Sequence, residues 1–238
     1  MSASRNGFNE KVGVSTAVIN RFMQSVTVGD LAAVEKCIER QPDAVTWRDN
    51  AHYTALHHAA SAGQAAVAAF LLDHGADVEA RTTDASRWDS VTPLIIAAQW
   101  EKNLDLVTLL AARGANLNAL SGQGETALMK AAQGMIYNVN QGQGEKVLRT
   151  LIALGADETL KDSSGRTAFD IASSTGTPEA AAAIREAVAQ RAEANLRHAQ
   201  EDRARDQAGI ENAVTAGIAA PAAILPPIKL KPKTPPSA

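Results

Sequence analysis

Residues 53–81 of the chain read YTALHHAASAGQAAVAAFLLDHGADVEAR, and the pattern of this stretch returns along the sequence. Its threonine, Thr54, has counterparts at Thr92, Thr126 and Thr167, at intervals of 38, 34 and 41 residues. A leucine-rich segment that ends in glycine and alanine follows each of the first three threonines. A recurring interval of this length indicates an array of repeated structural units.

Each unit is predicted to be a turn followed by two short antiparallel helices. The threonine supplies a capping hydroxyl before the first helix, and Pro93 stands where a missing N–H does no harm. Alanine pairs such as Ala59 and Ala60 allow neighbouring helices to approach closely. Apolar residues at helical spacing give the second helix one apolar face. Glycines then end the second helices in a left-handed conformation, at Gly75, Gly114 and Gly155.

The motifs TALHHAA, TPLIIAA and TALMKAA, with LLDHGAD after the first, resemble the ankyrin-repeat family. The resemblance covers about residues 20–188 and comprises three full repeats between degenerate N-terminal and C-terminal cap repeats. It implies an all-α solenoid of helix-turn-helix units with projecting turn fingers. The composition beyond the repeats predicts a C-terminal helix and then a disordered tail. Several repeats that agree in phase make this signal more specific than any single motif.

The composition of the chain changes outside the repeats. We expect a flexible N-terminus over residues 1–17, an ankyrin-repeat domain over 18–188 and a charged helical extension over 189–208. Six of the nine prolines lie in the last segment, 209–238, which cannot bury enough apolar surface to fold and is predicted to be a disordered tail.

Charge and cysteine content exclude several classes of partner and compartment. Residues 20–177 carry 13 Lys and Arg against 18 Asp and Glu, and this acidic balance disfavours nucleic acid as a partner. Cys37 is the only cysteine, so no intrachain disulfide is possible. No apolar run approaches the length of a membrane span. We therefore expect a cytoplasmic monomer without a nucleic-acid or membrane partner.

The adjacent histidines His57 and His58 raise the question of a metal or catalytic site. The resemblance implies that His57 hydrogen-bonds to backbone and ties neighbouring turns together. A helix separates the directions of adjacent side chains by about 100°, which makes joint chelation of one ion difficult. No phosphate-binding, dinucleotide-binding or nucleophile motif occurs. We predict a scaffold role for this pair, and a protein without catalytic residues, metal or cofactor.

Partners of ankyrin repeats are usually bound by the tips of the turns and by the concave face of the first helices, so the resemblance implies candidate residues at those positions. Exposed Trp, Tyr and Arg are frequent hot spots of protein interfaces. The alternative for Trp47 and Trp88 is packing between neighbouring turns. The candidate partner-binding residues, including those in two insertions, are Trp47, Asn50, His52, Tyr53, Arg87, Trp88, Asp89, Trp100, Glu101, Met135 and Tyr137.

One turn position departs from the family pattern. Gly124 and Gly165 retain the glycine that favours a positive φ, whereas His52 and Ser90 replace it. These two turns are expected to be less regular than the others.

The function predicted from the sequence is a protein-interaction module that acts as an adaptor or regulator. One alternative is an inhibitory partner of an enzyme, similar to an antitoxin or an immunity protein. A further alternative is a ligand-responsive or metal-responsive regulator that uses His52 and His74.

Overall fold

The structure is a computed structural model that describes residues 14–82, 90–100, 103–134, 144–174 and 178–215. It divides into a first unit that ends at Arg191 and a second unit from Ala192 onward. Within the described residues the elements are α1 (Thr16–Val28), α2 (Leu31–Arg40), the 3-10 helix η1 (Pro42–Thr46), α3 (Ala55–Ala62), α4 (Ala65–Asp73), α5 (Pro93–Ala98), α6 (Leu104–Ala112), α7 (Ala127–Gly134), α8 (Gly144–Ala153), α9 (Ala168–Ser174) and α10 (Pro178–Thr215).

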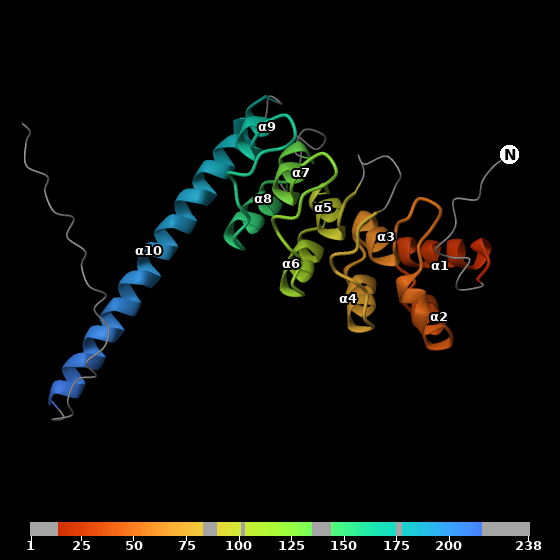
Figure 1. Cartoon of the computed structure of the whole chain (residues 1–238), viewed down its shortest axis with the longest axis horizontal. Helices are drawn as coiled ribbons and strands as arrows, with labels where there is room; N and C mark the ends of the chain where they lie inside the picture. Colours follow the sequence, from red (N-terminus) through yellow and green to blue (C-terminus); the bar gives the residue numbers. More distant parts are fainter. Residues whose placement is uncertain (1–13, 83–89, 101–102, 135–143, 175–177, 216–238) are drawn as a thin grey trace, which may run out of the picture. The chain divides into compact units, whose positions relative to one another are not determined.

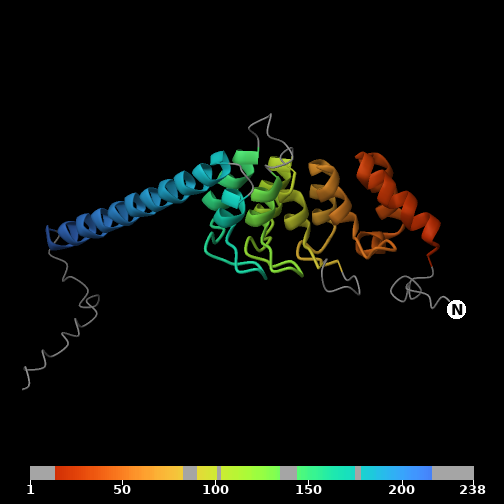
Figure 2. The ribbon, with the colours of Figure 1, turned by 90° about the horizontal axis from the view of Figure 1, so that it is seen from above.

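The helices of the first unit form two layers, and this arrangement confirms the predicted all-α solenoid. The first helices of successive repeats, α1, α3, α5, α7 and α9, contact one another in order along one row, and α2, α4, α6 and α8 form the second row (Figure 1). The turns before α7 and α9 project from the same side of the helices (Figure 2).

The predicted capping residues begin and end the helices of the repeats. Thr92 Oγ1 accepts a hydrogen bond from the Ile95 backbone N–H at 3.4 Å, and Pro93 follows at the start of α5. Gly75 adopts a φ of 87° directly after His74, the C-cap residue of α4, and Gly114 adopts 88° directly after Arg113, the C-cap residue of α6. The structure thus confirms these local signals of the sequence.

The core lies between the two layers and between successive repeats. The alanine pairs at the ends of the first helices are buried, as are the leucines of the second helices, for example Leu71 and Leu110. Asn103 is also buried, and its Nδ2 donates to the carbonyl of Ala60 at 2.8 Å across the repeat boundary. Each repeat therefore depends on its neighbour both for apolar burial and for hydrogen bonds.

Arginines link the turns of successive repeats. Arg48 Nη1 donates to the carbonyls of His52 at 2.9 Å and of Arg81 at 2.7 Å. Arg81 Nη1 in turn donates to the carbonyl of Leu120 at 2.8 Å. Because each guanidinium satisfies a backbone carbonyl of the following turn, the turns are held as a connected row.

His52 stands in the left-handed region, with a φ of 62°, and it is the only non-glycine residue with a positive φ in the part of the chain that the structure describes. Its backbone N–H donates to the carbonyl of Asp49 at 3.0 Å, which closes the turn. The replacement of glycine by histidine has therefore kept the backbone conformation of this turn.

Substitutions at position 52 should separate backbone strain from side-chain function. We expect His52→Val to lower the free energy of unfolding by about 1 kcal/mol relative to His52→Gly, because a β-branched side chain is strongly disfavoured at positive φ. Urea unfolding followed by circular dichroism measures the difference. Equal midpoints for the two variants would show that this turn relaxes without cost.

The first part of α10 packs on the last repeat, as the sequence predicted for a cap. Ala180, Ala183, Ile184 and Ala187 are buried. Arg191 Nη1 donates to the carbonyls of Ile152 at 3.2 Å and of Ala156 at 2.8 Å, at the end of α8. These contacts extend the first unit three residues beyond the expected boundary at 188.

The helical boundaries differ from the predicted segments at both ends. The first helix begins at Thr16, inside the segment 1–17 that was expected to be flexible, and α10 continues to Thr215 rather than ending near 208. From Ala192 to Ala208 every side chain is exposed, in agreement with the charged composition of this segment. Residues 1–13 and 216–238 lie outside the described residues.

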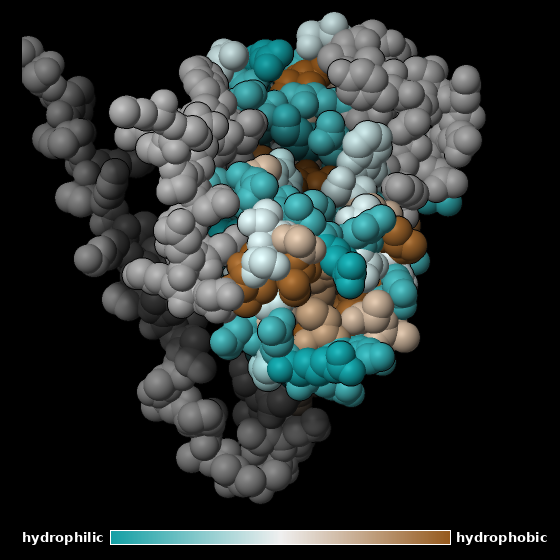
Figure 3. Space-filling model, turned by 90° about the vertical axis from the view of Figure 1, so that its right-hand side faces the viewer, coloured by the Kyte–Doolittle hydropathy of each residue, from teal (hydrophilic) through white to brown (hydrophobic). Residues whose placement is uncertain are grey.

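The N-terminal end of the first unit is formed by α1 and α2. Val18 and Val28 of α1 are both exposed. In the space-filling view of this end, small groups of hydrophobic residues are separated by hydrophilic ones (Figure 3). Scattered apolar residues of this kind are normal at a protein surface.

No helix among the described residues has both the length and the apolar character required to cross a bilayer.

Candidate functional site

The turn before α3 is fastened to that helix by Asp49. Its Oδ1 accepts the backbone N–H groups of Ala51 and Tyr53, each at 2.9 Å, and its Oδ2 lies 2.8 Å from Nε2 of His58. Burial acts to raise the pKa of Asp49, but the hydrogen bonds from His58 and from the Tyr53 backbone outweigh it and lower the pKa. Asp49 is thus a carboxylate that holds the turn and His58 together.

Tyr53 lies beside the two histidines of α3. Its ring centroid is 5.6 Å from that of His57, with an interplanar angle of 72°, and 5.9 Å from that of His58. The side chain is half-buried by these contacts. Tyr53 therefore presents a partly exposed aromatic edge where the turn meets the first helix.

His57 is part of the scaffold, as predicted. Its Nδ1 lies 2.7 Å from Thr54 Oγ1, and its Nε2 lies 3.2 Å from the carbonyl of Val91 in the next turn. Burial lowers the pKa of His57 to about 4, so the ring is neutral near pH 7. Both ring nitrogens have partners within the protein, and this leaves His57 unsuited to bind a partner or a metal.

Corresponding positions on the first helices line up across the repeats. His58, Ile96 and Lys130 each follow their capping threonine by four residues, and all three are half-buried on the adjacent helices α3, α5 and α7. Trp100 follows Ile96 by four residues and is 41% exposed. We use the name inner face for the surface formed by Tyr53, His58, Val91, Ile96, Trp100, Glu125 and Lys130.

A second polar cluster lies on the inner face at α7. Glu125 is only 5% exposed, and its Oε2 lies 2.5 Å from Nζ of Lys130. Gln133 Nε2 donates to Oε1 of the same carboxylate at 2.6 Å. Both carboxylate oxygens of Glu125 are therefore satisfied by side chains of α7.

The metal alternative predicted from the sequence uses His52 and His74, and His74 has local partners. His74 Nδ1 lies 2.8 Å from the carbonyl of Phe70, and the two rings are 4.0 Å apart. His52 belongs to the turn before α3. No group of three or more His, Cys, Asp or Glu residues is arranged to hold a metal ion in the ranges that the structure describes.

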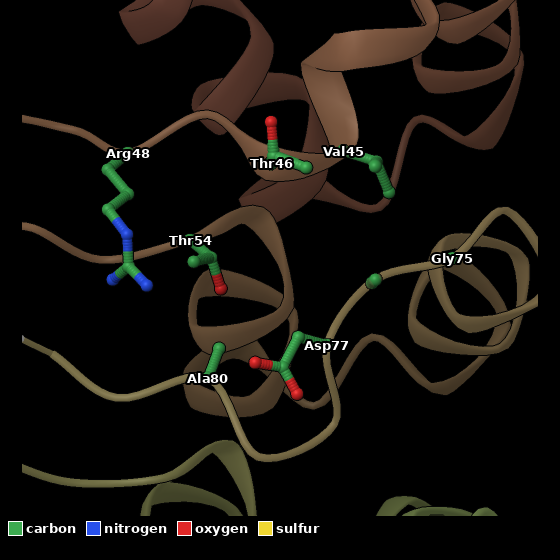
Figure 4. Close-up of a pocket in the computed structure, with 8 residues that line it drawn as sticks. Val45, Thr46, Arg48, Thr54, Gly75, Asp77 and Ala80 are labelled. Carbon is green, nitrogen blue, oxygen red and sulfur yellow. The ribbon is translucent and has the colours of Figure 1, made fainter. Parts of the chain in front are cut away.

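A pocket of about 190 Å³ lies between the turn before α3 and the loop after α4 (Figure 4). Arg48 and Asp77 line it together with Thr46 and Thr54. Burial lowers the pKa of Arg48, and the charge of Asp77 opposes this effect. Thr54 Oγ1 contacts His57, and Thr46 Oγ1 donates to the Asp43 carbonyl at 2.8 Å. Both hydroxyl groups thus have local partners, one within η1 and one at the start of α3.

Trp47, which was predicted to bind a partner, is buried in the structure. The side chain is 2% exposed, and its ring packs edge-on against Phe22 of α1, with centroids 5.7 Å apart and an interplanar angle of 81°. Trp47 is part of the core, because α1 covers a position that would be open in an isolated turn.

The other candidate residues fall into two groups. Asn50 is exposed, and His52 and Tyr53 are half-buried in one turn, while Trp100 is exposed at the end of α5. The remaining candidates lie outside the described residues, namely Arg87, Trp88, Asp89, Glu101, Met135 and Tyr137. Ile96 and Lys130 of the inner face were not among the residues predicted from the sequence, although their common offset from the capping threonines would have identified them.

Comparison with known proteins gives matches to repeat proteins of one kind. A family model for ankyrin repeats, in three copies, matches residues 22–121 and 94–198. The chain is 33% identical over 168 residues to a transient receptor potential cation channel subfamily A member 1 homolog of Caenorhabditis elegans, 68% of this chain and 13% of the relative. It is 34% identical over 122 residues to the B-cell lymphoma 3 protein homolog of Mus musculus, 51% of this chain and 24% of the relative.

A further relative is the ankyrin repeat and SOCS box protein 6 of Homo sapiens, 32% identical over 122 residues, 50% of this chain and 27% of the relative. The matched regions thus span about a quarter or less of the lengths of these relatives.

Proposed function

The chain belongs to the ankyrin-repeat family, and from this premise we propose that it is a non-catalytic adaptor or regulator that binds another protein through its turns and inner face. Ankyrin repeats are generally protein-interaction modules, and the described inner face offers the mixture of aromatic, aliphatic and polar groups that such binding requires. The acidic balance of residues 20–177 supports a protein rather than nucleic acid as the partner.

The observation that carries the proposal is the exposure of Trp100 just after α5. Trp100 is 41% exposed, and Ile96 is half-buried within α5. A tryptophan that packs on a partner removes a large apolar area from water, and such residues carry a disproportionate share of binding free energy. No observation on the described residues favours the inhibitory or the metal-responsive alternative, and both stay predictions.

Truncation of Trp100 should weaken partner binding. We expect Trp100→Ala to reduce the affinity for the partner about tenfold or more, the effect of removing an aromatic anchor from an interface. The assay is affinity capture from an extract of the source organism with quantitative mass spectrometry, followed by titration of the captured protein. Trp88→Ala, in the insertion outside the described residues, tests the neighbouring turn in the same way.

Leu154→Ala is the matched control, because Leu154 is 44% exposed but lies at the end of the second-layer helix α8. This variant should retain the partner. A chain that lacks residues 212–238 should also retain it. If that deletion abolishes binding and Trp100→Ala does not, the C-terminal segment is the recognition element and the assignment to the inner face is wrong.

A further inference from the structure

The charged side chains along the described inner face are compensated within the chain. Asp49 pairs with His58 at 2.8 Å on α3, and Glu125 pairs with Lys130 at 2.5 Å on α7. The next repeat continues this arrangement. Arg166 directly precedes its capping threonine, as Tyr53 and Glu125 do in their repeats, and it pairs with the buried Asp162 at 2.8 Å. In the Glu125–Lys130 and Asp162–Arg166 pairs, opposite charges lie at short range, so little of their field extends toward a partner. The carboxylate of Asp49 is held by hydrogen bonds from His58 and from the backbone N–H groups of Ala51 and Tyr53.

An uncharged strip separates the first two of these pairs. Residues 91–100, VTPLIIAAQW, contain no Asp, Glu, Lys or Arg. Val91, Ile96 and Trp100 are the partly or largely exposed apolar side chains of this strip. The centre of the inner face is therefore apolar, and its charged groups flank it on both sides.

The compensation determines which partner residues the inner face tolerates. A charged partner side chain placed over the strip would lose its hydration, and Val91, Ile96 and Trp100 carry no opposite charge to replace it. To gain such a charge, Glu125 or Lys130 would have to give up its present partner, and breaking a buried pair is strongly unfavourable. An uncharged apolar segment has neither cost.

We propose that the inner face selects an uncharged, apolar segment of a protein partner, which packs on Val91, Ile96 and Trp100 between the Asp49–His58 and Glu125–Lys130 pairs. This inference rests on the proposed function and specifies the chemistry of the partner. Binding of this kind depends weakly on ionic strength, because no charges of the complex become paired or separated across the interface.

A phage-displayed library of random peptides tests this selectivity without knowledge of the natural partner. The full-length chain is the bait, and Ile96→Lys, which puts a charge in the strip, is the counter-selection. Leu154→Lys adds the same charge on α8 and is the matched control. Circular dichroism verifies that each variant is folded before use.

We expect the selected peptides to be rich in aromatic and aliphatic residues with little net charge. Their affinity should fall at least about tenfold on Ile96→Lys and remain unchanged on Leu154→Lys. Their Kd should change less than about twofold between about 50 mM and about 500 mM NaCl.

Glu125→Gln gives an independent readout, because it leaves the ammonium group of Lys130 without its carboxylate. We expect this variant to acquire acidic peptides in a new selection, with a Kd that rises about tenfold over the same salt range. If Glu125→Gln instead selects the same uncharged peptides as the natural chain, the role of charge compensation is overturned.

Two outcomes distinguish a wrong partner chemistry from a wrong binding surface. If the peptides depend on Ile96 but are highly charged and salt-sensitive, the inner face is the binding surface and the proposed partner chemistry is wrong. If no peptide is retained, or if those retained bind Ile96→Lys as well as the natural chain, binding through the inner face is itself refuted.

Discussion

Acidification from pH 7 to pH 4 is expected to remove roughly 3 kcal/mol of folding free energy through His57 alone. The pKa of His57 is lowered from 6.5 to about 4 in the folded protein, chiefly by burial. The unfolded chain therefore binds a proton near pH 6.5, and the folded chain binds it only near pH 4. Each unit of this difference corresponds to about 1.4 kcal/mol, so stability falls as the pH decreases between these two values.

The physical cause is the position of His57 between two turns. Its ring nitrogens contact Thr54 and the carbonyl of Val91, and the ring has no exposed surface. A second proton would put a positive charge in this apolar environment and would change Nδ1 from an acceptor of the Thr54 backbone N–H into a donor. Protonation is therefore coupled to the loss of the contact between these repeats.

Urea unfolding at a series of pH values measures this effect. Other groups also titrate in this range, so the decisive quantity is the difference between the natural chain and His57→Gln, which cannot accept the proton. His57→Gln should be less stable at pH 7 but should lose less stability between pH 6.5 and pH 4. His198→Gln, in the second unit, controls for the loss of an imidazole outside the repeats. Parallel curves for the natural chain and His57→Gln would contradict the assignment.

A chain that ends at residue 177 is expected to lose much of its stability, whereas a chain that ends at Arg191 should retain it. The chain that ends at residue 177 lacks Ile184 and three buried alanines of α10, together with the hydrogen bonds of Arg191. Burial of one aliphatic side chain contributes about 1.5–3 kcal/mol, so the combined loss is on the order of 5 kcal/mol. The apolar faces of α8 and α9 that this truncation uncovers should also promote aggregation.

Urea midpoints and sedimentation velocity distinguish the two truncations. Removal of residues 192–238 takes away only side chains that are exposed over the described range, so it should leave the midpoint unchanged. Arg191→Ala in the full chain removes its carbonyl contacts together with its ion pair to Glu158, and it is expected to cost about 2 kcal/mol. Similar midpoints for the chains ending at 177 and at 191 would show that α10 does not cap the repeats.

The repeat fold could be predicted from the sequence because its signals are local. The threonine before each first helix, Pro93, the alanine pairs and Gly75 act over one or two helical turns, and the structure places each as predicted. His57 could be recognised as scaffold for the same reason, since its position in the motif implies its contact with the next turn.

Exposure and pairing could not be predicted in this way. Trp47 is of a residue type that is frequent in binding sites, but Phe22, 25 positions earlier in the sequence, covers it. The sequence likewise contains Glu125 and Lys130 without showing that they neutralise one another on the inner face. The period and capping of the helices determine each repeat by itself. Which side chains reach solvent, and which charges remain available to a partner, depends on how successive repeats stack, because a surface that is open on one repeat is closed by the next.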